Sequence, residues 1–155
     1  MSPFRWESRV YWEDTDGGGI VYYANYLRFL ERARTEWLRS LGYSQRALAE
    51  EPGIVFAVVS LNIEYRKPAK LDDELLITCE PKVEGAATIV FAQQIYRSAG
   101  GTQAGGTQAI DQGPASLLVE ASARVACLDA RTLRPRRLPD FLATAGSGAN
   151  NKEPS

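Results

Sequence analysis

The sequence predicts an α+β domain in which one long helix packs against an antiparallel five-stranded sheet. Over residues 25–41, apolar positions recur every three or four residues, which is typical of an amphipathic helix. One run before this stretch and four runs after it are rich in Val, Ile, Thr and aromatic residues, as strands are. The chain has 155 residues, of which 45% are hydrophobic and 24% charged, so it is long enough for one ordinary globular domain.

The first elements follow from local patterns. Residues 4–12 alternate between a mostly apolar and a polar face, which predicts a strand. Residues 13–19 carry two aspartates and three consecutive glycines, which break any regular element. The helix is expected to begin at Asn25 as its N-cap and to stop at Gly42.

The second half of the chain reads as four strands with short connections. A hairpin turn is expected over residues 82–86, where a glycine follows Glu84. One helix cannot cover both faces of a five-stranded sheet, so either the sheet wraps around the helix or a second chain covers the rest. Apolar edge strands favour pairing with another subunit. The predicted strands are residues 54–65, 74–84, 86–97 and 117–128.

Domain limits follow from composition. Residues 98–116 are rich in glycine and repeat the pentamer GGTQA, which predicts a flexible insertion at a hairpin tip. Residues 144–155 are rich in Gly, Ser and Asn and are expected to form a disordered tail. A single domain over residues 1–143 remains.

Composition excludes several classes of function. The net charge of -1 argues against a nucleic-acid reader. The absence of histidine removes Ser-His-Asp and Cys-His catalysis, and two cysteines, Cys79 and Cys127, are too few for a Cys-rich metal site, so no metal is expected. No targeting signal and no run of ~18 apolar residues is apparent, which favours a cytoplasmic protein with reduced thiols and no transmembrane segment.

The glycine-rich turn is the segment best suited to chemistry. It delivers backbone N–H groups at the positive end of a helix dipole, which favours an anion or a carbonyl oxygen that develops negative charge. Asp14 and Asp16 lie just before it, where a carboxylate could attack a thioester or activate water. Equally, both aspartates could simply satisfy turn amides.

Two sequence blocks resemble one family. Residues 9–38 match the pattern D-x-D-x-x-G-[IV]-V-[YW]-x-x-N-Y followed by a helix, and Tyr65 begins a Y-x-x-P-A-x-x-D-D block. Over roughly residues 5–142 the chain resembles hotdog-fold acyl-CoA thioesterases, in the branch of 4-hydroxybenzoyl-CoA thioesterase and the Tol-Pal-associated thioesterase. The resemblance implies a hotdog: an antiparallel sheet wrapped around a central helix, with paired subunits, active sites between them, and further assembly of the homodimer into a homotetramer.

The same resemblance implies site residues. Asp16 matches the catalytic carboxylate, and the Tyr23 N–H matches the group that polarises the thioester carbonyl. At Tyr23 the Tol-Pal branch usually has histidine and the 4-hydroxybenzoyl branch an aromatic residue, so Asp16 is the only obvious carboxylate for the chemistry. The residues expected to bind substrate, with a basic pair for the coenzyme A phosphates, are Gly19, Tyr22, Asn25, Ser60, Arg66 and Lys67.

The predicted function is therefore hydrolysis of an acyl-CoA thioester, with coenzyme A as part of the substrate and no separate cofactor. A binding module for acyl-CoA or acyl-carrier protein, without turnover, is the alternative, because one fold hosts both tasks. A hotdog dehydratase would need a His/Asp pair, and this chain has no histidine. The acyl group stays open between aromatic and aliphatic.

Overall fold

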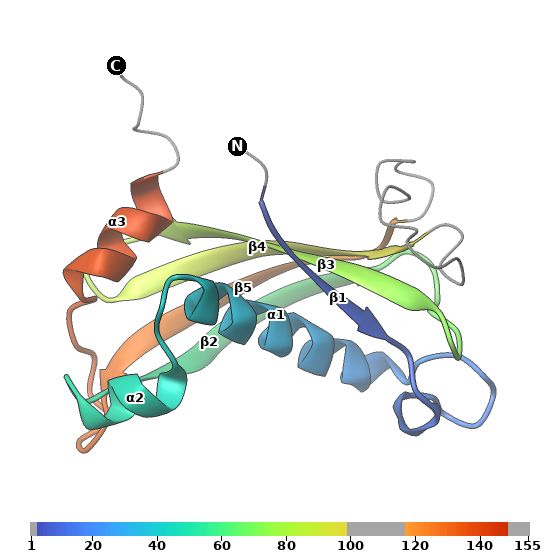
Figure 1. The fold of residues 1–155 in the computed structure, drawn as a ribbon, viewed down its shortest axis with the longest axis horizontal. Helices are drawn as coiled ribbons and strands as arrows, with labels where there is room; N and C mark the ends of the chain where they lie inside the picture. Colours follow the sequence, from blue (N-terminus) through green and yellow to red (C-terminus); the bar gives the residue numbers. More distant parts are fainter. Residues whose placement is uncertain (1–2, 99–116, 149–155) are drawn as a thin grey trace.

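The computed structural model describes residues 3–98 and 117–148. Figure 1 shows a curved sheet with one long helix lying along its inner side. The sheet has five strands in the order β1-β3-β4-β5-β2, and each neighbouring pair is antiparallel. The elements are β1 (Phe4–Arg9), η1 (Trp12–Asp14), η2 (Tyr23–Asn25), α1 (Tyr26–Ser40), α2 (Gln45–Glu50), β2 (Ile54–Tyr65), β3 (Glu74–Val83), β4 (Thr88–Arg97), β5 (Leu117–Asp129) and α3 (Asp140–Gly148).

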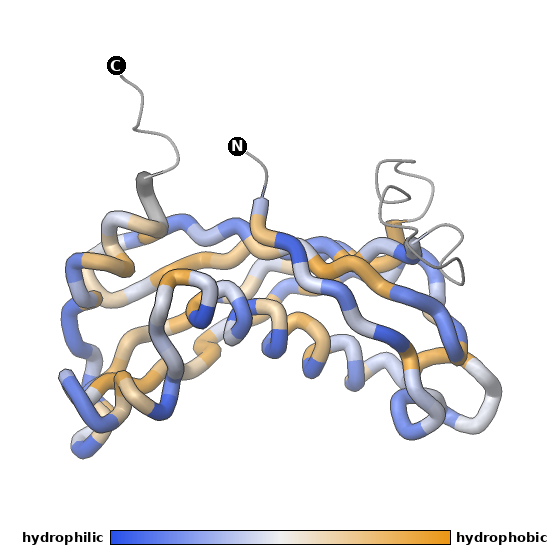
Figure 2. Tube along the Cα trace, in the orientation of Figure 1, coloured by the Kyte–Doolittle hydropathy of each residue, from blue (hydrophilic) through white to orange (hydrophobic). Residues whose placement is uncertain are grey.

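The amphipathic pattern of α1 accounts for its place. Its apolar stripe faces the sheet and is buried, and most of its charged residues are exposed, whereas Arg34 reaches the sheet and donates to Gln93 on β4 at 3.0 Å. Figure 2 shows apolar segments where the helix and the inner face of the sheet meet. Burying that face against the sheet supplies the hydrophobic stabilisation of the helix, as predicted. The buried stripe consists of Tyr26, Phe29, Leu30, Ala33, Trp37 and Leu38.

The two edges of the sheet are β1 and β2. In β2 the register with β5 shifts between Val58 and Ser60, so Val59 forms a bulge. Val58, Val59 and Leu61 are 49%, 57% and 37% exposed. An exposed apolar edge of this length is a surface that associates readily with another strand.

The chain between β1 and α1 differs from the prediction. The first strand ends at Arg9 rather than at residue 12, because a 3₁₀ turn begins at Trp12 and Asp14 caps it. Asn25 occupies the N-cap position of α1, as predicted, but it is the last residue of η2, so its backbone is already helical, and its side chain makes no cap hydrogen bond. Gly42, with φ of +96°, ends α1 as predicted.

Two short helices were not predicted. α2 occupies the stretch left as variable, and Ser44 caps it by accepting a hydrogen bond from the Ala47 N–H. The domain end predicted at residue 143 falls inside α3, which continues to Gly148. Most of the predicted insertion and the last seven residues of the predicted tail lie outside the described residues. In the part of the chain that is described, no helix is long and apolar enough to span a bilayer.

Candidate active site

Asp14 anchors the turn between β1 and α1. Its side chain is 7% exposed, and its Oδ2 atom accepts a hydrogen bond of 2.8 Å from the Tyr11 N–H. Its carbonyl oxygen accepts from the Tyr22 N–H at 3.1 Å and from Asn25 Nδ2 at 2.9 Å. The buried carboxylate closes the 3₁₀ turn, and the main-chain carbonyl joins this turn to the start of the helical segment, so these contacts of Asp14 are structural.

Asp16 is placed differently from Asp14. It is exposed, and its Oδ1 atom accepts a hydrogen bond of 2.8 Å from the Gly18 N–H, as in an Asx turn. Its own N–H donates to the carbonyl of Ile20. Within the described residues nothing donates to Oδ2, so one carboxylate oxygen is oriented by the turn and the other is available for chemistry.

The second sequence block supports this glycine turn. The Gly19 carbonyl accepts from the Leu71 N–H at 3.0 Å, and the Val21 N–H donates to the Ala69 carbonyl at 2.8 Å. Gly19 has φ of +87°, which only glycine adopts without strain. The glycine turn and the block that begins at Tyr65, about fifty residues apart in sequence, therefore form one structural unit, and the Gly19 carbonyl is already hydrogen-bonded within it.

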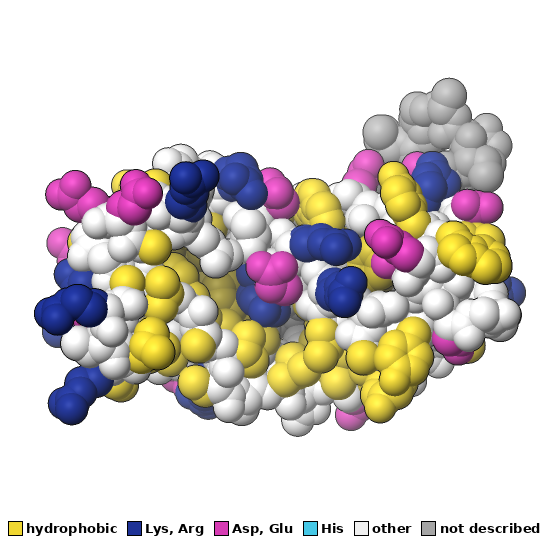
Figure 3. All heavy atoms as spheres, turned by 90° about the horizontal axis from the view of Figure 1, so that it is seen from below, with side chains coloured by type: hydrophobic (Ala, Val, Ile, Leu, Met, Phe, Trp, Pro, Cys, Tyr) yellow, Lys and Arg dark blue, Asp and Glu magenta, His cyan; other side chains and the backbone are white. Residues whose placement is uncertain are grey.

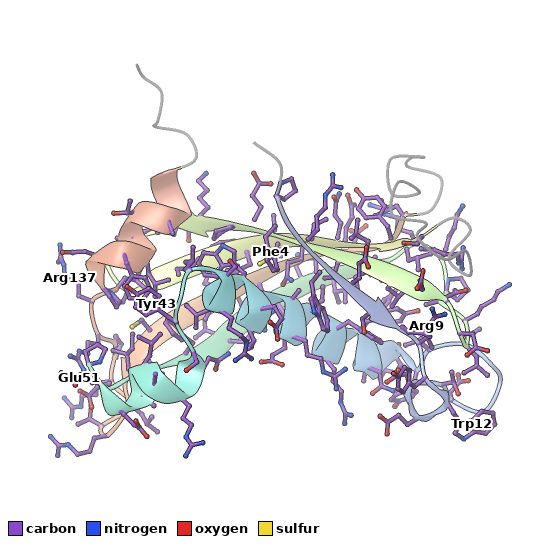
Figure 4. All side chains as sticks on the ribbon, in the orientation of Figure 1. Phe4, Arg9, Trp12, Tyr43, Glu51 and Arg137 are labelled. Atoms are coloured by element: carbon purple, nitrogen blue, oxygen red, sulfur yellow. The ribbon has the colours of Figure 1, made fainter. Side chains whose placement is uncertain are left out.

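The start of the helical segment leaves donors free. The first N–H groups of a helix have no acceptor within it, and among the described residues neither the Tyr23 nor the Ala24 N–H has an acceptor outside it. Tyr23 is 63% exposed and Tyr22 46% exposed, with ring centroids 5.0 Å apart. The segment that carries these donors lies at the end of the molecule where Trp12 projects (Figure 4). These donors can receive a carbonyl oxygen.

Tyr65 joins the sheet to this turn. Its hydroxyl donates a hydrogen bond of 3.0 Å to the Tyr23 carbonyl. Its ring lies edge-on to Tyr23 at 6.2 Å and tilted against Tyr26 at 5.4 Å. Burial, and then the neighbouring Tyr23 hydroxyl, raise the pKa of Tyr65, so this hydroxyl keeps its proton over the neutral range.

The remaining predicted binding residues are more scattered. Ser60 lines a shallow hollow with Asn62, Val90, Ser122 and Arg124, and no residue of the glycine turn belongs to it. The Arg66 guanidinium pairs with Glu64 at 3.1 Å and Glu120 at 2.7 Å.

Two more predicted binding residues are Lys67, which follows β2, and Asn25, which ends η2. Lys67 is exposed just after β2, and its N–H donates to the Leu118 carbonyl. The Asn25 amide donates to the Asp14 carbonyl. Thus Asp16, Gly19, Tyr22, Tyr23 and Asn25 share one turn, while Ser60 and Arg66 lie outside it.

A separate cavity of about 120 Å³ lies beside the C-terminal half of α1. Its walls combine apolar residues, including Trp37, Phe56 and Phe91, with polar residues of α1 and α2, and neither Asp16 nor Tyr23 lines it. Figure 3 shows the face that carries α1, where apolar patches lie between charged side chains. In the isolated chain the candidate site is therefore an open surface. Among the described residues no cluster of acid or thiol side chains could hold a metal ion.

Comparison with known proteins matches this architecture to one family. A model of the Thioesterase superfamily matches residues 18–104, which include Gly18 and Gly19 at the end of the glycine turn, α1 and Tyr65, and which begin after Asp16. The chain belongs to the thioesterase superfamily. Its fold is the hotdog fold, as predicted.

Several proteins that are similar to this chain are named as thioesterases. The acyl-CoA thioesterase YbgC of Haemophilus influenzae is 40% identical over 142 residues, covering 92% of this chain and 93% of that protein. The acyl-CoA thioester hydrolase YbgC of Escherichia coli O6:H1 is 42% identical over 136 residues, covering 88% and 90%. A probable thioesterase from Bartonella henselae superposes with a TM-score of 0.73 at 32% identity, covering 87% of this chain and 98% of that one. This thioesterase-superfamily member is thus similar over most of its length to proteins named as thioesterases.

A more distant structure agrees in fold alone. The 4-hydroxybenzoyl-CoA thioesterase of Pseudomonas sp. strain CBS-3 has a TM-score of 0.73 at 24% identity, covering 91% of this chain and 96% of that one.

The sequence pattern predicted the glycine turn of this superfamily member but not the contact of Tyr65 with it. The only signal was that the second block begins with a tyrosine at the end of a predicted strand.

Proposed function

We propose that this chain hydrolyses acyl-CoA thioesters and that Asp16 supplies the reacting carboxylate. One observation carries the proposal: an exposed aspartate keeps one oxygen unpaired in the turn that leads into free helix-start donors. Membership of the thioesterase superfamily and the names of relatives such as YbgC support the reaction class. The Tyr23 N–H receives the thioester carbonyl oxygen and stabilises the charge that develops on it.

Two routes to product fit this arrangement. The Asp16 carboxylate attacks the carbonyl carbon, the C–S bond breaks, and coenzyme A leaves as thiolate; this forms a mixed anhydride, which water then hydrolyses. Alternatively Asp16 takes a proton from water, the water oxygen attacks the carbonyl carbon, the C–S bond breaks, and the proton passes from Asp16 to the leaving thiolate. Both routes release the acid and coenzyme A and restore the carboxylate. A thiol with a pKa near ~8.5 leaves without a strong general acid, which fits a chain that has no histidine.

Substrate contacts follow from the surroundings of the turn. Tyr22 offers an exposed aromatic surface to the acyl or pantetheine part. Arg66 and Lys67, both exposed just after β2, form the basic pair that we propose for the coenzyme A phosphates. Reversing the charge of both residues to Glu should raise KM for the CoA ester.

The proposal includes a homodimer that completes the open site, with further assembly into a homotetramer. The free apolar edge of β2 supports it, because a second copy can extend the sheet there. We also place the protein in the cytoplasm, where free thiols such as Cys79 and Cys127 stay reduced. Val59→Asp should give a monomer in light scattering and lose activity. A variant that stays dimeric and active would contradict this use of the edge.

The central test is release of free thiol from a panel of short aliphatic, long aliphatic and aromatic CoA esters. Asp16→Asn should lower kcat by about 100-fold or more, while its amide oxygen still accepts the Gly18 N–H and preserves the turn. Asp72→Asn, at an exposed position in a neighbouring loop, is the matched control and should keep full activity. Wild-type kcat/KM in Asp16→Asn would remove Asp16 from the chemistry. No thiol release by the wild-type chain from any ester would favour a binding module instead.

A further inference from the structure

The helix-start donors of the candidate site lie on an exposed turn that packing alone does not fix. Tyr22 and Tyr23 are 46% and 63% exposed, and among the described residues the Tyr23 ring lies beside the rings of Tyr22 and Tyr65. A binding group for a developing oxyanion has to be held in place before the reaction begins. The bonds of the Tyr22 N–H and the Asn25 amide to the Asp14 carbonyl hold the segment as a whole, and the hydrogen bonds on the carbonyl side of the donor peptide groups hold those groups directly.

Each of the two peptide groups has such a hydrogen bond. The peptide group that carries the Tyr23 N–H has the Tyr22 carbonyl, which accepts from the Asn25 N–H at 2.8 Å. The next group carries the Ala24 N–H and has the Tyr23 carbonyl, which accepts from the Tyr65 hydroxyl at 3.0 Å. A hydrogen bond to the carbonyl of a peptide group polarises it and strengthens its N–H as a donor.

The two hydrogen bonds differ in origin. The bond to the Tyr22 carbonyl is local and forms with the 3₁₀ turn itself. The bond to the Tyr23 carbonyl comes from the last residue of β2, 42 positions away in sequence. Tyr65 is therefore the side chain through which the sheet sets the orientation of the turn.

The geometry points to Tyr65 as a positioning residue for thioester hydrolysis, which holds the Tyr23 carbonyl so that the Tyr23 and Ala24 N–H groups face the substrate carbonyl. The inference rests on the proposed function. Tyr65 itself touches no reacting atom in this role. Its hydroxyl acts on the transition state through the peptide group, so its loss should lower kcat more than it changes KM.

The test compares two tyrosines that each lose one hydroxyl. Tyr65→Phe keeps the ring contacts and removes the hydrogen bond to the turn. Tyr96→Phe removes a bond of 2.7 Å to Gln94 Oε1 on β4, away from the glycine turn. We expect Tyr65→Phe to lower kcat roughly 3- to 10-fold, which is the effect expected from the loss of one hydrogen bond, and to keep KM within about twofold of the wild type. Tyr96→Phe should leave both constants unchanged.

A spectroscopic measurement separates positioning from a merely structural role. A carbonyl-labelled thioester bound to Asp16→Asn should show an infrared C=O stretch shifted to lower frequency, because the N–H donors polarise it. Adding Tyr65→Phe should reduce that shift, and adding Tyr96→Phe should not. If wild-type protein hydrolyses the ester but Tyr65→Phe matches Tyr96→Phe in kcat and in the stretch, the positioning role is overturned while the hydrolase survives. If the wild type releases no thiol, both ideas fall.

Discussion

Gly18 offers a way to displace the Asp16 carboxylate without altering the carboxylate itself. A Cβ atom at this position would lie 3.3 Å from Asp16 Oδ1, and the Gly18 N–H already donates to the same oxygen. Its φ is not in the positive range that favours glycine, so alanine can adopt this backbone. Gly18→Ala should therefore leave the fold intact and move one carboxylate.

The magnitude follows from the contact. A separation of 3.3 Å has to relax by a few tenths of an ångström, and the exposed Asp16 side chain yields more easily than backbone does. Since a misplacement of ~1 Å can cost roughly 100-fold in rate, this shift should lower kcat about 5- to 10-fold. The free energy of unfolding should change little. Alanine raises it by ~0.4–1 kcal/mol because it restricts the unfolded chain, and the tight contact with Asp16 offsets part of this increase.

Gly85 is the matched control. It lies in the hairpin between β3 and β4 with φ of +81°, and a Cβ there meets no atom within 4 Å. Gly85→Ala should cost about 1–2 kcal/mol of backbone strain, lowering Tm by about 2–8 °C with kcat unchanged. Thiol release at saturating CoA ester, with a thermal melt of each variant, measures both. Full kcat in Gly18→Ala, or a loss that merely tracks Tm, would refute the role of this carboxylate.

Three further predictions concern the anchor of the turn and the thiols. Asp14→Ala leaves the Tyr11 N–H without its acceptor and should lower the free energy of unfolding, measured by urea titration, by about 1–3 kcal/mol. Asp14→Asn keeps an acceptor and should recover most of this loss. Equal losses in the two variants would contradict the hydrogen-bond argument. Burial raises the pKa of Cys79 to about 12, so native protein at pH 8 should react with a thiol reagent only on unfolding, and rapid labelling would contradict the buried position. In the folded protein the pKa of the Cys79 thiol lies above its ordinary value of 9.0, so the contribution of this thiol to stability is complete below pH 9 and is lost toward pH 12. In a plot of the urea midpoint of unfolding against pH, Cys79→Ala should therefore reduce the decline between pH 9 and pH 12.

Long periodic elements could be predicted from the sequence because burial decides them. The β2 strand runs over Ile54–Tyr65 as its composition indicated, and the stripe of α1 is buried as its spacing required. The same holds for the hairpin turn, where Gly85 takes the positive φ that a glycine allows. In these elements local pattern and tertiary packing favour the same conformation.

Short elements escaped prediction because single contacts decide them. α2 has six residues, and its clearest signal was the Ser44 hydroxyl at the N-cap, which is easily taken for a loop residue. Asn25 has the composition of an N-cap, but its amide is drawn to the Asp14 carbonyl, eleven residues earlier. The Asn25 side chain therefore donates to this carbonyl and accepts no hydrogen bond from the first N–H groups of the helix, and a 3₁₀ turn precedes α1.

The turn that carries the candidate site could be predicted from the sequence, but its contact with Tyr65 could not. Asp16 and the glycines are adjacent in the chain, so their proximity needs no tertiary fold. The contribution of Tyr65 depends on β2 ending beside η2, which only the sheet order β1-β3-β4-β5-β2 establishes. A hydroxyl 42 positions away has no periodic signature that could reveal its target.

The same strand carries the free edge and the residue that holds the turn. Val59 bulges out near the middle of β2, and Tyr65 ends it against the Tyr23 carbonyl. A second strand paired with this edge would run alongside Tyr65 and would exclude water from the exposed tyrosines of the turn. Excluding water strengthens the interaction of the N–H donors with a developing oxyanion. Association along β2 and activity at Asp16 are therefore expected to be lost together, because both depend on the position of one strand.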